Sequence, residues 1–142
     1  MRGLARPFER GQRGQAVVEF ALVFGIFAFL LMGIFDFGRG VAAYNAISNA
    51  AREGARLAIH NPAEFNAGTD ANIRAEVINR TAMLAGLGPG DIDITPAQAA
   101  RTYGDVVTVR VSYRFAPVTP VISAFLPGGA VDLSASAKAV VR

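Results

Sequence analysis

The sequence predicts an α+β fold: a long N-terminal helix, a second helix, and a small antiparallel sheet of three to four strands. Three observations support this prediction. Residues 15–35 form an apolar run, and helix-compatible residues continue from it to about Ile59. Apolar and polar residues then alternate along 102–115 and along 131–141, as in strands with one buried face. The chain has 142 residues, which is enough for one domain with a modest core.

The first segment, residues 1–14, is basic. It holds four Arg and one Glu, a net charge of +3 that equals the net charge of the whole chain. The remaining residues are therefore formally neutral. A domain that binds nucleic acid needs surplus Lys and Arg on its folded surface to neutralise phosphates, so we expect no nucleic-acid partner.

The next segment, Gln15–Phe35, is long and apolar enough to cross a membrane. Its 21 residues contain a single charge, Glu19. At about 1.5 Å per residue they span roughly 31 Å, which matches the hydrocarbon core of a bilayer. Arg clusters before the segment, whereas Asp36 and Arg39 cancel after it. The positive-inside tendency therefore places the N-terminus in the cytoplasm and the C-terminal part across the membrane.

A cleavable secretory signal is the competing interpretation of this segment. Such signals have an apolar region of about 7–15 residues that ends at a small-x-small site. Here the run is longer, contains Glu19 near its start, and is followed by FDFGRG. We therefore expect the apolar helix to remain on the mature protein.

The helix is expected to continue outside the membrane, for a total of roughly 45 residues, and to stop before Pro62, because proline disfavours helix at the residue preceding it. Gly38 and Gly40 mark the position where a kink or an interruption of the helix is expected. Small residues recur every four positions and form a ridge that allows another backbone to approach closely. That backbone belongs either to a second helix or to the sheet of the same chain. The ridge comprises Ala42, Ala46, Ala50, Gly54 and Ala58, and Ala21 and Gly25 begin a similar pattern in the apolar half.

The sequence after residue 61 predicts a small folded domain, which we call the head. Thr69 or Asp70 can cap a helix to about Ala85, with Ile73, Val77, Met83 and Leu84 on its buried side. Strands are predicted at 91–95, 102–115 and 131–141, with a short helix or covering loop at VISAFL, 121–126. We divide the chain into a basic cytoplasmic leader (1–14), a transmembrane helix (15–36), an extracytoplasmic continuation of that helix (37–61) and an α+β head (62–142).

Catalytic and metal-binding patterns are missing from the sequence. The chain has no cysteine and one histidine, His60, and it contains no nucleophile elbow, phosphate-binding loop or dinucleotide fingerprint. His60 is expected to cap a helix or lie on the surface. Asp91 and Asp93 would share one solvated strand face. Two carboxylates are too few ligands for a cation site. We expect no enzyme, no cofactor and no metal.

Glu19 is the most informative residue of the apolar run. A carboxylate at the edge of the hydrocarbon costs a few kcal/mol and requires a cation nearby. It either reaches back to the headgroups or Arg13, or pairs with an amine. Of the five Glu residues, Glu19 alone has a glycine five positions earlier, Gly14, where the basic segment ends. A cut after Gly14 would free an α-amine on Gln15.

These residues resemble the signal of type IV pilins and pseudopilins: a basic leader, a Gly, then a Glu five residues on within an apolar helix. The closer similarity is to the TadE-like family of tight-adherence pilus systems. It extends to AAREGAR at residues 50–56, which contains Arg52, Glu53 and Arg56, and covers about residues 11–62. Within this motif, Glu53 and Arg56 are spaced to form an i,i+3 ion pair on one helix, and the alternative, which the resemblance favours, is that these charges contact another subunit.

The resemblance implies specific roles. A prepilin peptidase would cut after Gly14, Gln15 would become the first residue, and Glu19 would pair with such an amine, commonly on an adjacent subunit. The implied function is that of a pseudopilin or minor pilin acting in pilus assembly, initiation or adhesion, at the bacterial inner membrane, with other pilin subunits and the assembly platform as partners. The alternative is an uncleaved, membrane-anchored binding module that docks pilus or secretion components.

Overall fold

The computed structural model describes residues 10–59 and 69–141, with side chains from residue 14 onward, and it confirms the predicted α+β fold. His60 and the other residues of 60–68 lie outside the described part. The helices are α1 (Arg10–Ala58), α2 (Asp70–Arg80) and α3 (Pro120–Phe125). The strands are β1 (Ile92–Thr95), β2 (Val106–Phe115) and β3 (Val131–Val140). Short 3-10 turns lie at Pro89–Asp91, Gln98–Ala100 and Pro127–Gly129.

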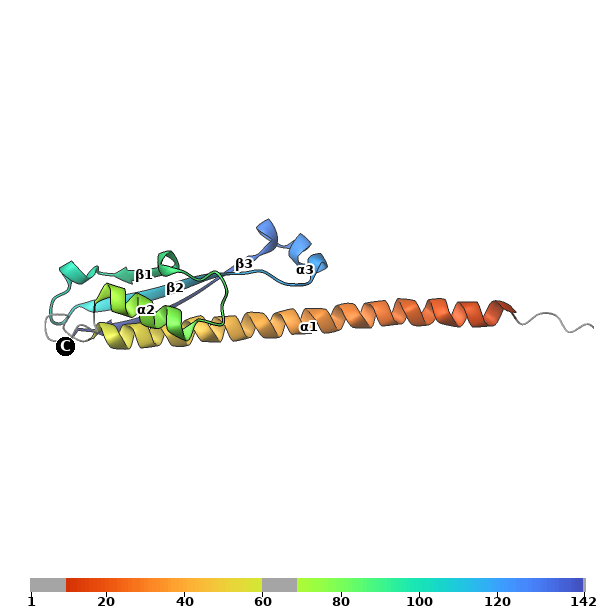
Figure 1. Ribbon diagram of the computed structural model, residues 1–142, viewed down its shortest axis with the longest axis horizontal. Helices are drawn as coiled ribbons and strands as arrows, with labels where there is room; N and C mark the ends of the chain where they lie inside the picture. The colour runs from red at the N-terminus through yellow and green to blue at the C-terminus, as the bar shows by residue number, and fades with distance from the viewer. Residues whose placement is uncertain (1–9, 60–68, 142) are drawn as a thin grey trace, which may run out of the picture.

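Helix α1 sets the shape of the molecule. It runs for 49 residues, and the sheet and α2 lie along its C-terminal half while its N-terminal half projects alone (Figure 1). The predicted end near Ile59 is confirmed. The helix continues through Gly38 and Gly40, so the expected interruption there is wrong. At Gly40, a Cβ placed on the backbone would lie 3.6 Å from the Phe115 ring, so β2 packs on the helix where its own propensity is weak.

The sheet has three antiparallel strands in the order β1-β2-β3. The central strand β2 pairs with β1 through Ile92 opposite Val111, and with β3 through Val111 opposite Ala135. The predicted alternation is confirmed along β2, where Val107, Val109 and Val111 are fully buried. The first predicted strand begins one residue late: Asp91 lies in a 3-10 turn and accepts a hydrogen bond from the Gly88 amide at 2.8 Å.

Helix α2 starts as predicted and ends early. The Thr69 hydroxyl caps it by accepting from the Asn72 amide at 3.2 Å. The helix stops at Arg80 instead of Ala85, because the Thr81 hydroxyl donates to the Val77 carbonyl at 2.7 Å and the chain then turns. The turn directs Met83 outward, with 78% of its surface exposed, so its predicted burial is wrong.

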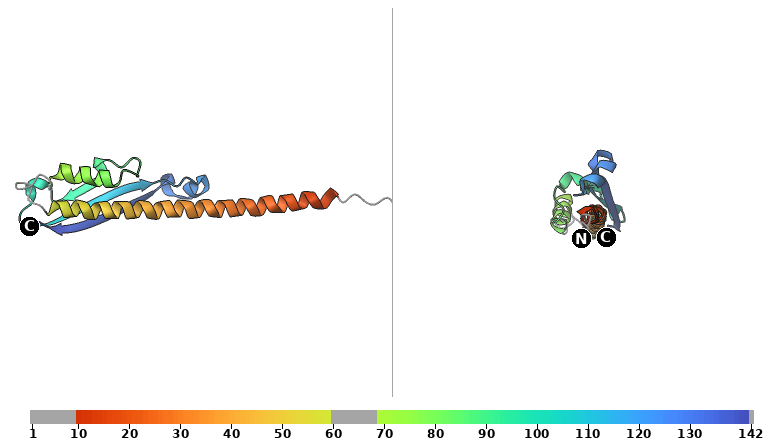
Figure 2. Two further views of the ribbon diagram at one scale, coloured as in Figure 1. Left: turned by 60° about the horizontal axis from the view of Figure 1, so that its bottom comes forward. Right: turned by 90° about the vertical axis from the view of Figure 1, so that its right-hand side faces the viewer.

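The core lies between α1, α2 and one face of the sheet. In the end-on view of Figure 2, α2 flanks α1 on one side and the sheet wraps the other. The contribution of α1 consists mostly of alanines, whose short side chains let the helix sit close to the strands. The buried residues of this core are Ile47, Ala50, Ala51, Ala55, Ala58, Ile73, Val77, Ile92, Ile94, Val107, Val109, Val111, Ala135 and Val141.

Candidate functional site

The N-terminal half of α1 is exposed and apolar. Every large apolar side chain from Val17 to Phe37 is at least 42% exposed, and this stretch meets the length and composition needed to cross a membrane. A water-soluble chain does not leave a continuous apolar helix uncovered. With the N-terminal position of the stretch, this exposure fits a single-pass membrane protein.

The predicted processing residues lie at the start of this exposed stretch. Gly14 and Gln15 are exposed and helical, and the Gln15 side-chain amide donates to the Glu19 carboxylate at 2.9 Å. The carboxylate therefore points back along the helix toward the Gln15 side chain, as side chains in a helix do. The alternative partner, the Arg13 side chain, lies outside the described part. Because Gly14 is helical, a protease would have to unwind the backbone there, and glycine weakens a helix by about 1 kcal/mol relative to alanine.

The far end of the apolar stretch carries a buried carboxylate whose role sequence reasoning missed. Asp36 is only 3% exposed and accepts hydrogen bonds from the backbone amides of Val118 at 3.0 Å and Thr119 at 2.8 Å. Arg39 donates to the same carboxylate at 3.0 Å, and its guanidinium lies 5.4 Å from the centre of the Phe115 ring. These contacts fix the loop before α3 to α1, where the apolar stretch meets the head.

In the sequence, Asp36 and Arg39 are recognisable only as two charges that cancel after the apolar run. The sequence signal that was available is an acid directly after an apolar run, since such a group requires donors that satisfy it. The identity of those donors could not be predicted, because they are backbone amides more than 80 residues away in the chain.

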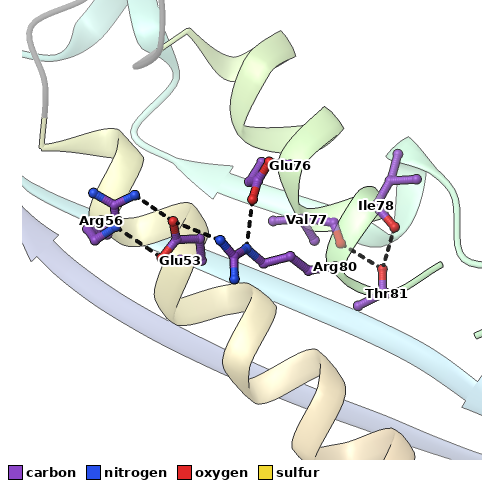
Figure 3. Close-up of polar contacts among 7 residues, drawn as sticks. All are labelled: Glu53, Arg56, Glu76, Val77, Ile78, Arg80 and Thr81. Carbon is purple, nitrogen blue, oxygen red and sulfur yellow. Dashed lines mark hydrogen bonds and ion pairs between the residues drawn. The ribbon is translucent and has the colours of Figure 1, made fainter. Parts of the chain in front are cut away.

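The charged side of the AAREGAR motif links α1 to α2. Glu53 binds Arg56 on its own helix, with a shortest distance of 2.6 Å, and Arg80 on α2 at 3.2 Å, as Figure 3 shows. Arg80 also pairs with Glu76 at 2.7 Å. The hydrogen bond and the positive charge of Arg56, together with Arg80, lower the pKa of Glu53. The Arg52 guanidinium lies apart from this cluster and donates to the Asn49 side chain at 3.0 Å.

The small residues of the same motif face the core. Gly54 is buried, and a Cβ placed there would lie 3.1 Å from a methyl carbon of Val109, 3.1 Å from one of Val77 and 3.3 Å from one of Ile73. Glycine thus lets α1 contact both α2 and β2 at a point where even a methyl group would be crowded. The motif therefore combines a close-packed face of small residues with an ion-paired face.

The ridge of small residues divides between these two environments. Ala50, Gly54 and Ala58 are buried against the sheet and α2 of their own chain. Ala46 is half-buried and Ala42 is exposed. In the apolar half, Ala21 and Gly25 are exposed, and nothing lies within 4 Å of the position of a Cβ at Gly25. The ridge residues available to another helix are therefore those toward the N-terminus.

Residues 10–59 and 69–141 contain no group of three His, Cys, Asp or Glu side chains close enough to hold a metal ion. Asp93 lies on the exposed face of β1, opposite Arg110 of β2 in the strand register. The prediction that Asp91 and Asp93 share one strand face is therefore wrong, because Asp91 belongs to the preceding turn.

The comparisons with known proteins bear on α1. A family model described as TadE-like protein matches residues 14–56. No curated protein and no solved structure matches the chain. The matched region runs from Gly14 to Arg56, so it contains the exposed apolar stretch, Glu19, Asp36 and the AAREGAR motif, and it excludes α2 and the sheet. The resemblance predicted from the sequence is confirmed, and the long first helix of this chain carries the TadE-like region.

Proposed function

We propose that this chain is a pseudopilin or minor pilin of a tight-adherence pilus system. The TadE-like region suggests involvement in such a system. The observation that carries the finer proposal is the arrangement at the start of that region. Gly14 ends the basic segment, and Glu19 is the single charge of the exposed apolar stretch, with its carboxylate directed back toward residue 15.

In the proposed pathway, a prepilin peptidase removes the cytoplasmic leader, residues 1–14. Gln15 then carries a free α-amine at the start of a transmembrane helix, 15–36. The new ammonium and the positive end of the helix dipole are both opposite in charge to the Glu19 carboxylate, which lies about one turn further along the helix. Since isolated charges are each costly at low dielectric, joining the Glu19 carboxylate to the amine of a neighbouring subunit recovers much of that cost and fixes the register between subunits.

The rest of the chain fits this role. The span continues as an extracytoplasmic helix to Ala58, and the head stands across the membrane from the leader. The exposed small residues Ala21, Gly25 and Ala42 face neighbouring helices. The assembly platform or other subunits can bind the exposed side chains of Arg52 and of Arg56, which pairs with Glu53. The role is structural, in assembly, initiation or adhesion.

Two variants test the proposal in the host that makes the pilus. Gly14→Ala adds a side chain at the cut site and is expected to leave residues 1–14 attached. Glu19→Ala is expected to be cut normally and to remain in the membrane without entering an assembly. Glu19→Asp is the matched control, since it keeps the charge and shortens its reach. Mass spectrometry of the purified protein measures cleavage, and crosslinking followed by electrophoresis measures assembly.

The competing function is an uncleaved membrane anchor whose head binds pilus or secretion components. For that protein, both variants would behave as the wild type in cleavage and in assembly. A Glu19→Ala protein that assembles normally would overturn the proposed role of the carboxylate even where cleavage occurs.

A further inference from the structure

The segment around α3 is apolar and uncovered. Residues 115–127 contain no charged side chain, and α3 buries none of its residues. Phe125 is 85% exposed, Val118 62% and Val121 48%. We call residues 115–127 the α3 loop. In Figure 1 it lies at the end of the head nearest the projecting half of α1.

The α3 loop is held at the depth of the membrane. Asp36, at the end of the transmembrane segment, binds the amides of Val118 and Thr119. The Ile122 side chain lies 3.8 Å from the position of a Cβ at Gly33. Gly33 is three residues before Asp36, so this contact is about 4.5 Å deeper along the helix than Asp36. Ile122 therefore lies level with residues that face lipid.

The surface between the two elements is also apolar. An open groove of about 410 Å³ separates α1 from α3. Its lining residues are Phe29, Leu30, Gly33, Ile34, Phe37 and Ile122. Ile34 and Phe37 are 68% and 74% exposed, so the groove is continuous with the lipid-facing surface of α1. The Ser123 hydroxyl donates to the Pro120 carbonyl at 2.9 Å and so needs no water.

We propose that the α3 loop inserts into the leaflet nearest the head, with Phe125 and Val118 among the acyl chains and a chain end filling the groove. The physical basis is that apolar helices in the bilayer interface bury their apolar face about 5–10 Å deep. The head is then attached to the bilayer at a second point, which sets its tilt relative to α1. The proposal depends on α1 spanning a membrane, and it is independent of leader cleavage and of Glu19.

Single-cysteine labelling tests this cleanly, since the natural chain has no cysteine. Phe125→Cys is compared with Tyr103→Cys, because both side chains are 85% exposed while Tyr103 lies beside the C-terminal end of β3, at the opposite end of the head. Each full-length variant carries a small fluorophore and is reconstituted in vesicles of phosphatidylethanolamine and phosphatidylglycerol. Quenching is measured with nitroxide-labelled lipids and, separately, with iodide in the water phase.

Insertion predicts that the label at 125 is quenched by the nitroxide lipids and shielded from iodide, whereas the label at 103 is quenched by iodide and not by the nitroxide lipids. Val118→Cys should behave in the same way. Equal iodide quenching at 125 and 103 would overturn the proposal. Protection at 125 that disappears when the protein is diluted in lipid would also overturn it, because a second copy of the chain, and not lipid, would then cover the loop. Phe27→Cys, in the middle of the span, shows whether α1 itself is embedded, so a failure of the span is distinguished from a failure of the loop to insert.

Discussion

Replacing Gly54 tests whether the AAREGAR motif packs as the structure shows. Gly54→Ala adds one methyl group that meets carbon atoms of Val109, Val77 and Ile73 at 3.1, 3.1 and 3.3 Å. These three side chains are fully buried and belong to two different elements, so they cannot all move away together. Overpacking of this kind costs about 1–3 kcal/mol.

The gain in helix propensity from glycine to alanine, about 1 kcal/mol, offsets part of that cost. Gly54→Ala should therefore change the free energy of unfolding by between about 0 and −2 kcal/mol. A matched control isolates the steric part. Asn45 is exposed on the same helix, so alanine and glycine at position 45 differ only in helix propensity. The free energy of unfolding should therefore be about 1 kcal/mol higher for Asn45→Ala than for Asn45→Gly.

The assay is urea unfolding of the full-length protein in detergent micelles, followed through tyrosine fluorescence and circular dichroism, because the chain has no tryptophan. Replacing glycine by alanine should raise the free energy of unfolding less at position 54 than at position 45, and the difference should be about 1–3 kcal/mol. If Gly54→Ala stabilises the protein as much as the control exchange does, the close contact between α1, α2 and β2 is not present and the reasoning is refuted.

Three further predictions concern the polar contacts. Asp36→Ala leaves two loop amides without an acceptor, at a cost of about 1–3 kcal/mol for the buried Thr119 amide, so the hydrogen exchange of both amides should accelerate; unchanged protection would contradict the contact. Glu53 has a pKa below its ordinary value of 4.5, so its stabilising contribution is complete above that pH and is lost as the pH falls through the lowered pKa. When the free energy of unfolding is measured at decreasing pH, it should thus fall less for Glu53→Gln than for the wild type. Thr69→Ala removes the cap of α2 and should reduce stability by about 1 kcal/mol in urea, whereas Thr69→Ser should not.

Much of the fold was predictable because it depends on periodicity. The apolar run and its helical continuation predicted α1, and alternation predicted β2 and β3, since one face of each strand packs in the core and the other meets water. The end of α2 was not predictable in the same way. The helical pattern continues through Met83, and a hydrogen bond from the Thr81 hydroxyl to the helix backbone, followed by a turn, interrupts it.

The site was predicted less completely, because its contacts are long-range. Spacing along one helix predicted the Glu53–Arg56 pair, but the third member, Arg80, comes from α2. The recurrence of small residues predicted a ridge but could not separate Gly54, which packs on its own chain, from Ala42, which stays exposed. These differences depend on which elements meet in space, and no local pattern contains that information.

Leader removal is the central claim, and the N-terminus of the membrane-embedded protein tests it most directly. Intact-mass and N-terminal peptide analysis of the protein, purified from the membranes of its own host, should find a chain that begins at Gln15, with or without a methylated amine. A chain that retains residues 1–14 would contradict the account, because Glu19 would then have no new ammonium to neutralise it.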